Sequence, residues 1–214
     1  KNESSIAMRL IKAGLKRNVD FCLYGDFQNY LFPILSTYIY NKSFIALAQI
    51  TLTERCSLKC KKCAHACYAV DNNSVDLSLE QVYKSADSFF SKVDYIQEFV
   101  LIGGEPMLYK DLAETISYIG KKYRKQIITY SITTNGTIIP TNDVLEACKK
   151  YGVLIRISNY VQQIPRLKEQ YKHLLSILQE NEVLSIAGVY ERVLLNKTLK
   201  CAKHDYQLLS ILAN

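Results

Sequence analysis

The stretch "FVLIGGEPMLYKDLAETISYIGKKYRKQIITYSITTNG", residues 99–136, shows the alternation of elements from which the fold follows. An apolar strand ends in a glycine pair, a helix is expected over about 111–123, and a second strand is expected over 127–136. Two strands joined by a helix of this length pair in parallel, because a parallel neighbour needs a long crossover connection. The stretch therefore predicts a parallel sheet with helices packed outside it.

The same alternation continues on both sides of this stretch. Ser78 and Gln81 form a capping-box pattern at the start of a helix, and Gly152 is a typical residue to close another. We expect an α/β fold, a partial (β/α)6 TIM-like barrel with parallel strands. The further elements that we expect are strand 46–53, helix 79–91, helix 142–151, strand 153–160, helix 166–182, strand 183–188 and a candidate sixth strand at 191–199.

The two ends of the chain do not follow this alternation. Apolar residues over 6–15 recur at helical spacing and predict an N-terminal helix. We therefore expect an N-terminal helical extension over 1–45, a core domain over 46–200 and a C-terminal tail over 201–214. The short tail leaves open that the chain is a catalytic core without its natural lid or accessory domain.

Composition excludes several classes of protein. The chain of 214 residues is 49% hydrophobic and 22% charged, which is typical of one globular domain. Its formal charge of +7 comes from scattered basic residues, and no nucleic-acid-binding module is present, so no nucleic-acid partner is expected. The longest apolar stretch, residues 30–40, is broken by Pro33 and is shorter than the roughly 20 residues of a membrane span. Without a signal-peptide pattern, the expected location is the cytoplasm.

Cysteine usage indicates metal or iron–sulfur ligation. Four of the seven cysteines fall in "TERCSLKCKKCAHAC", residues 53–67, a pattern unlike a disulfide framework and typical of a reducing compartment. Cys22 and Cys148 are expected to be buried as small apolar residues, and Cys201 has no companion. The clustered cysteines are Cys56, Cys60, Cys63 and Cys67.

The spacing C-x-x-x-C-x-x-C of Cys56, Cys60 and Cys63 can wrap three thiolates around one corner of a cubane cluster. A four-iron cubane needs four ligands, so three cysteines leave one iron open to substrate or cofactor. Cys67 could instead fill that position and give a closed four-cysteine site. A zinc-stabilised structural site is a third reading, although four ligands in one short loop differ from the usual two separated pairs.

Three unusual stretches follow successive expected strands. The cysteine loop follows the first strand, "GGEP" at 103–106 follows the second, and "TTNG" at 133–136 follows the third. In parallel α/β sheets and barrels, functional groups lie on the loops at the carboxyl ends of strands. The three stretches are therefore expected to meet at one rim.

The cysteine spacing together with "IGGEPMLY", residues 102–109, resembles the radical S-adenosylmethionine (SAM) superfamily over roughly 47–188. The resemblance implies a [4Fe-4S] cluster on Cys56, Cys60 and Cys63, with SAM on the fourth iron. It also implies reductive cleavage of SAM to methionine and a 5′-deoxyadenosyl radical, which abstracts hydrogen from a substrate inside the barrel. A flavodoxin or ferredoxin would supply the electron.

The resemblance also implies a set of SAM-binding residues. The glycines would let the backbone approach the methionyl part, the glutamate would accept from the amino group, and the proline would fix the turn. Strand-end polar residues would meet the ribose or carboxylate, and an arginine could make paired hydrogen bonds to a carboxylate. The alternative role for each is that of an ordinary turn or strand-end residue. In order, these are Gly103, Gly104, Glu105, Pro106, Asn135, Ser158 and Arg156. No catalytic residue is assigned.

The sequence departs from the family pattern in places. Lys62 stands where many members carry an aromatic residue, and the isolated Cys201 indicates no additional cysteine-rich cluster domain. His65 is expected to be a surface or supporting group. Basic residues around the cysteines either stabilise an anionic cluster or belong to a solvated loop. These are Arg55, Lys59, Lys61 and Lys62.

The leading hypothesis is thus a radical SAM enzyme of unknown substrate. The wording "CKKCAHAC", "IGGEPMLYKDL" and "ISNY" resembles a bacterial subgroup associated with carbohydrate or peptide modification, which suggests a peptide or carbohydrate conjugate. The alternative is a non-catalytic iron–sulfur protein that uses all four cysteines for electron transfer or regulation.

Overall fold

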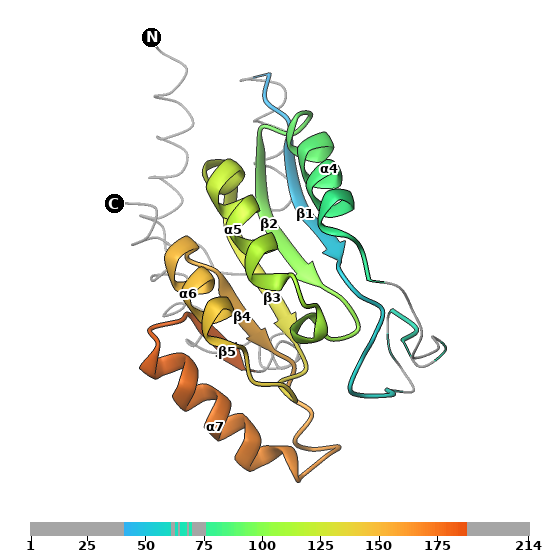
Figure 1. Cartoon of the computed structure of the whole chain (residues 1–214), viewed down its shortest axis with the longest axis vertical. Coiled ribbons are helices and arrows are strands. Elements are labelled where there is room, and N and C mark those ends of the chain that lie inside the picture. Colours follow the sequence, from blue (N-terminus) through green and yellow to red (C-terminus); the bar gives the residue numbers. More distant parts are fainter. Residues whose placement is uncertain (1–40, 61–62, 64, 68, 70–75, 188–214) are drawn as a thin grey trace, which may run out of the picture. The chain divides into compact units, whose positions relative to one another are not determined.

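The structure is a computed structural model, and it describes residues 41–60, 63, 65–67, 69 and 76–187. These residues form a five-stranded sheet in which the strands follow their order in the sequence, with a helix between successive strands (Figure 1). The strands are β1 (Phe44–Thr51), β2 (Tyr95–Ile102), β3 (Ile127–Thr134), β4 (Leu154–Ile157) and β5 (Ser185–Ala187).

The helices begin and end largely where the sequence predicts. Ser78 Oγ accepts a hydrogen bond from the Gln81 amide, and Gln81 Oε1 accepts one from the Ser78 amide, so the predicted capping box is confirmed. Gly152 closes its helix in the left-handed region at φ 61°. The helices are α4 (Leu79–Phe90), α5 (Leu112–Tyr123), α6 (Asn142–Tyr151) and α7 (Leu167–Glu180), with short 3₁₀ turns η2 (Pro106–Leu108) and η3 (Arg124–Gln126).

Parallel pairing confirms the predicted α/β class. Ile96 lies beside Ile127, Ser131 beside Leu154, and Ile155 beside Ser185, each pair in parallel strands. Helices α4, α5 and α6 lie against one face of the sheet (Figure 1), as same-handed crossovers between sequential strands require. The candidate sixth strand at 191–199 and the expected helix at 6–15 lie outside the described residues, and the predicted domain boundaries stay predictions.

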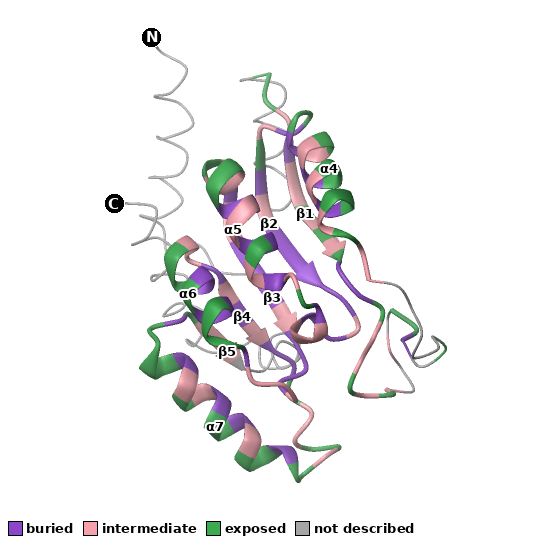
Figure 2. Ribbon diagram, in the orientation of Figure 1, coloured by how far each residue is buried: buried purple, intermediate pink, exposed green. Residues whose placement is uncertain are grey.

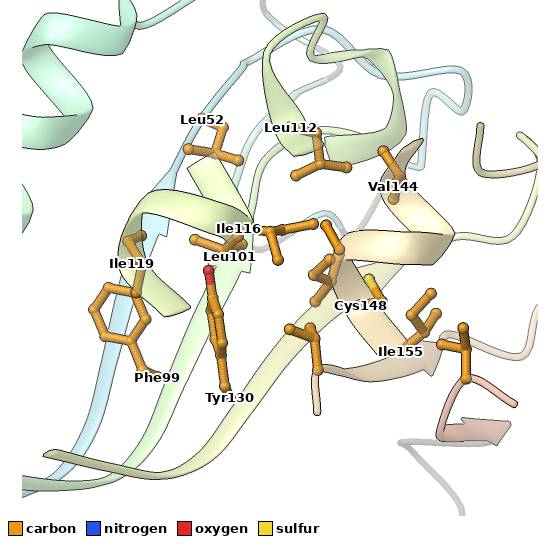
Figure 3. Close-up of a cluster of buried hydrophobic side chains, with 14 of the residues drawn as sticks. Leu52, Phe99, Leu101, Leu112, Ile116, Ile119, Tyr130, Val144, Cys148 and Ile155 are labelled. Carbon is orange, nitrogen blue, oxygen red and sulfur yellow. The ribbon is translucent and has the colours of Figure 1, made fainter. Parts of the chain in front are cut away.

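The core fills the space between the sheet and these helices (Figure 3). The outward sides of the helices are exposed, while the centre of the sheet is buried (Figure 2). Cys148 belongs to this core at 1% exposure, which confirms its expected role as a small buried residue, and burial raises its pKa to about 12. Prominent core side chains are Leu52, Phe99, Leu101, Ile116, Ile119, Tyr130, Ile132 and Ile155.

The opposite face of the sheet is more polar. Because side chains alternate along a strand, Ser131 points away from its core neighbours Tyr130 and Ile132. Ser131 Oγ donates to Glu98 Oε1 at 3.0 Å, and Arg156 Nη1 forms an ion pair with the same oxygen. We call Glu98, Ser131 and Arg156 the inner-face triad.

The bounds of the described strands all differ from the expectation, and the largest differences are at β2 and β4. β2 begins at Tyr95, although the apolar run begins only at Phe99, because Glu98 lies on the polar face and is already paired with β3. β4 ends at Ile157 and does not reach residue 160. In the part of the chain that the structure describes, no helix is long and apolar enough to cross a bilayer.

Candidate functional site

The cysteine loop leaves β1 along the end of β2. The Gly104 amide donates to Thr53 O at 2.8 Å, and the Glu105 amide donates to Arg55 O at 2.8 Å. These bonds continue the pairing between the two strands beyond their regular ends. The "GGEP" turn therefore holds the first residues of the cysteine loop in place.

Both glycines are required by this close approach. A Cβ atom on Gly103 would lie 2.6 Å from Thr53 O, and one on Gly104 would lie 2.3 Å from Arg55 O. A Cβ atom does not come this close to a non-bonded oxygen, so any side chain would push the two backbones apart. The glycine pair thus has a contact inside the protein besides the SAM contact implied by the family resemblance.

Arg55 fastens the loop from its other side. Its Nε and Nη2 atoms donate to the two carboxylate oxygens of Asp76 at 3.0 and 2.5 Å, and Nη2 also donates to Leu108 O at 2.8 Å. Thr53 Oγ1 donates to Asp76 Oδ1 at 2.6 Å. Burial alone would raise the pKa of Asp76, but the hydrogen bonds from Arg55 and Thr53 hold it below its usual value. Arg55 is therefore a partly exposed residue whose charge is paired with Asp76.

Glu105 joins the "GGEP" turn to the end of β3. Its carboxylate has no exposed surface and accepts from the Met107 amide at 3.1 Å, Thr134 Oγ1 at 2.7 Å and the Asn135 amide at 2.8 Å. Burial raises the pKa of Glu105, and the three donors oppose that shift. Pro106 follows as the first residue of η2. The side chain is thus a brace between two rim loops.

The end of β3 in turn contacts the cysteine loop and the end of β4. Asn135 Nδ2 donates to Cys56 Sγ at 3.6 Å and to Ser57 Oγ at 3.0 Å. The Ser158 amide donates to Thr134 O at 2.9 Å. The predicted site residues Cys56, Glu105, Asn135 and Ser158 are therefore brought together at one rim, as their positions after successive strands predict.

Sequence reasoning missed Tyr171. From α7, its hydroxyl lies 2.8 Å from Asn135 O and 2.9 Å from Ser158 O, within donating distance of both carbonyls. It holds the third and fourth strand ends together. In the sequence, Tyr171 is one more apolar position of an amphipathic helix, and no local signal distinguishes it.

Arg156 differs in position from the other predicted SAM-binding residues. It precedes Ser158 by two residues, and its guanidinium belongs to the inner-face triad with Glu98. The side chains of Arg156 and Glu98 are only 17% and 21% exposed. Arg156 therefore lies along the inner face below the rim.

The cysteines lie on successive tight turns. The Cys63 amide donates to Cys60 O at 3.2 Å, and the Ala66 amide donates to Cys63 O at 3.1 Å. Cys56, Cys60 and Cys63 are partly exposed, whereas Cys67 is buried, its pKa raised to about 11 by burial and by the adjacent Cys63.

The chemistry of this donor set fits a cubane cluster. Among the described residues, no three His, Cys, Asp or Glu side chains converge on a point that could hold a single metal ion. A cubane does not need such convergence, because each thiolate binds a different iron atom. Two N–H groups directed at Cys56 Sγ, those of Leu58 and Asn135, also suit a sulfur that carries negative charge. His65 adjoins this loop, and its backbone carbonyl contacts the Cys67 thiol.

Comparison with known proteins identifies the family. Residues 50–178 match the sequence model of the Radical SAM superfamily, and the chain belongs to that superfamily. The predicted family is thereby confirmed, together with its cofactor class, a [4Fe-4S] cluster and SAM.

Relatives differ in what they act on. A GTP 3′,8-cyclase from Stenotrophomonas maltophilia (strain R551-3) is 33% identical over 101 residues, 47% of this chain and 29% of the cyclase. The antilisterial bacteriocin subtilosin biosynthesis protein AlbA from Bacillus subtilis (strain 168) is 34% identical over 106 residues, 49% of this chain and 21% of AlbA.

A solved structure shares the fold. Streptococcus suis SuiB bound to S-adenosylmethionine superposes with a TM-score of 0.53 at 17% identity, over 88% of this chain and 45% of SuiB. This likeness confirms the partial TIM-like barrel. The chain spans less than half the length of each of these three proteins.

Proposed function

We propose that the chain is a radical SAM enzyme whose [4Fe-4S] cluster is bound by Cys56, Cys60 and Cys63. When bound, the cluster supplies an electron to the sulfonium of SAM, which gives methionine and a 5′-deoxyadenosyl radical for hydrogen abstraction from a substrate. The observation that carries the proposal is the rim itself. There, the cysteine loop is hydrogen-bonded to the "GGEP" turn and to Asn135.

The residues of the rim would bind and orient SAM. In this proposal, Gly103, Gly104 and Pro106 shape the turn that meets the methionyl part. Glu105 holds that turn against β3, and its Oε2 accepts one described hydrogen bond, from the Asn135 amide. In the proposal that oxygen accepts a second one from the SAM amino group, which requires the rim to open on binding because the carboxylate has no exposed surface.

Two predicted contacts lie at the end of β4. The Ser158 carbonyl accepts from Tyr171, and in this proposal the Ser158 hydroxyl meets the ribose or carboxylate of SAM. Arg156 would reach a carboxylate with the guanidinium edge that faces away from Glu98. SAM binding by Arg156 therefore requires Glu98 and the SAM carboxylate to share one guanidinium.

A peptide or carbohydrate conjugate remains the proposed substrate class. Support comes from AlbA, a relative named for bacteriocin biosynthesis, and from the polar inner-face triad below the rim. An electron donor such as a flavodoxin or ferredoxin and a cytoplasmic location belong to the same proposal, because exposed thiols of this kind need a reducing compartment.

The test is anaerobic reconstitution of the full chain, reduction with dithionite in the presence of SAM, and mass-spectrometric detection of 5′-deoxyadenosine. Formation of this product is expected in the wild type and in Cys148→Ala, which removes a core thiol far from the cysteine loop. Cys60→Ala is expected to abolish it.

A brown, cluster-containing chain that forms no 5′-deoxyadenosine would contradict the proposal and favour a closed four-cysteine site. Cys67→Ala distinguishes the two. It should leave iron content and product formation unchanged if three cysteines hold the cluster, and should lower iron content if Cys67 is a ligand. A colourless protein that binds zinc instead would overturn both readings.

A further inference from the structure

Cys56 is contacted by two N–H donors of different origin. The Leu58 amide lies 3.4 Å from Cys56 Sγ and belongs to the same short turn. Asn135 Nδ2 lies 3.6 Å from the same sulfur, but it comes from the loop after β3, 79 residues further along the chain. The second contact therefore depends on the tertiary fold.

The orientation of the Asn135 amide follows from its neighbours. Its Oδ1 atom accepts from the Thr137 amide at 2.9 Å and from Thr137 Oγ1 at 2.6 Å. A backbone N–H can only donate, so the atom facing it must be the carbonyl oxygen. The NH₂ group is thereby turned toward Cys56 and Ser57.

The backbone of Asn135 is equally constrained. Its amide donates to the buried Glu105 carboxylate, its carbonyl accepts from Tyr171, and the residue is only 8% exposed. The donor is thus held in place by the turn after β2, the end of β3 and α7 together, and it needs no rearrangement to meet a charged sulfur.

We propose that Asn135 is a positioning residue that raises the reduction potential of the cluster through its hydrogen bond to the Cys56 sulfur. The inference rests on the proposed function, in which Cys56 is a cluster ligand. A hydrogen bond withdraws electron density from a ligand sulfur and favours the reduced, more negative cluster over the oxidised one. The reduction potential of the cluster would thereby depend on whether the rim loops hold Asn135 in place.

The experiment is an EPR-monitored redox titration of the anaerobically reconstituted full chain. Asn135→Leu keeps the approximate size of the side chain and removes the donor. We expect it to retain the iron content of the wild type and to have a more negative midpoint potential. Thr137→Val is the matched control. It removes a hydroxyl bonded to Asn135 Oδ1 and to Ser57 Oγ but leaves the Thr137 amide and the N–H contact with sulfur, so its potential should equal that of the wild type.

A second pair of variants tests the inference if Asn135→Leu does not fold. Asn135→Asp keeps the shape and the acceptor oxygen but replaces the donor with a negative charge. Asn159→Asp places the same charge on an exposed residue of the neighbouring rim loop. The inference requires a larger negative shift for Asn135→Asp than for Asn159→Asp.

Equal shifts for these two variants, or an unchanged potential in a fully loaded Asn135→Leu protein, would overturn the inference and leave the proposed function standing. A wild-type chain that shows no cluster EPR signal after reconstitution and reduction with dithionite would overturn the proposed function and this inference with it.

Discussion

Gly104 occupies a point at which two backbones leave no room for a side chain. A Cβ atom there would lie 2.3 Å from the carbonyl oxygen of Arg55, in the segment that leads into the cysteine loop. The same two segments are joined by the amides of Gly104 and Glu105. The absence of a side chain at Gly104 therefore allows the two segments to pair and fixes the start of the cysteine loop.

Gly104→Ala is expected to destabilise the fold by about 1–3 kcal/mol, the usual range for overpacking, and to reduce iron incorporation. Urea unfolding and iron content after reconstitution measure the two effects. Gly152→Ala is the control. It strains a left-handed residue at the C-terminal end of α6, where the added Cβ would make only an ordinary van der Waals contact with Arg124 at 3.6 Å, and it costs about 1 kcal/mol. If both variants lost iron equally, general destabilisation and not the local approach would be responsible.

At the scale of elements, α4 and α5 are joined by a polar cluster on the protein surface. Asp87 on α4 accepts from Tyr123 at 2.5 Å, from Tyr118 at 2.7 Å and from Lys122 at 2.9 Å. Tyr83 of α4 stacks on Tyr118 of α5 with ring centroids 3.7 Å apart. The two helices are thereby fixed against each other outside the core.

Hydrogen bonds from Tyr123, Tyr118 and Lys122 lower the pKa of Asp87 to about 2. Because the folded pKa is depressed, this stabilisation is present above the ordinary pKa of about 3.8 and is lost as the pH falls toward 2. With the Asp87 side chain 43% exposed, solvent screening limits the cost of Asp87→Asn to about 1 kcal/mol at neutral pH.

Urea unfolding at pH 7 and pH 3 should show the difference between wild type and Asp87→Asn shrinking at the lower pH. Glu169→Gln breaks an exposed pair with Lys172 on α7 and should change the free energy of unfolding very little. A difference for Asp87→Asn that stays constant between the two pH values would contradict the assigned cause.

The sequence predicts helices better than strand limits, and the reason lies in particular residues. Ser78, Gln81 and Gly152 fix helix ends through local hydrogen bonds and a left-handed φ, so their effect can be seen in the sequence. The charged residue Glu98 interrupts the apolar pattern of β2, so the sequence predicted only the second half of that strand. Its pairing with Ser131 and Arg156 depends on two other strands and has no local signal.

For the whole molecule, the site residues with a signal in the sequence could likewise be predicted, whereas those whose contacts depend on the tertiary fold could not. The family resemblance singled out Glu105 and Asn135, and their positions after successive strands predicted that they meet at one edge, because parallel strands bring their carboxyl ends together. The roles of Tyr171 and of the Arg55–Asp76 pair in holding the rim loops together were not predicted from the sequence. Their contacts join segments whose proximity exists only in the folded chain.

A double-mutant cycle on the ion pair of the inner-face triad tests whether that pair is needed for folding or for SAM cleavage. Replacing one member of a largely buried ion pair leaves an uncompensated charge, so Glu98→Leu or Arg156→Met should each cost about 2–3 kcal/mol in urea unfolding. The double variant should cost about 1 kcal/mol or less, because an apolar pair suits a sheet face. The same cycle on the exposed Lys149–Glu182 pair should give almost no coupling. Equal coupling in both cycles would contradict this reasoning. A stable double variant that still forms 5′-deoxyadenosine would show that neither folding nor SAM cleavage requires the charged pair, and it would contradict the proposed contact of Arg156 with the SAM carboxylate.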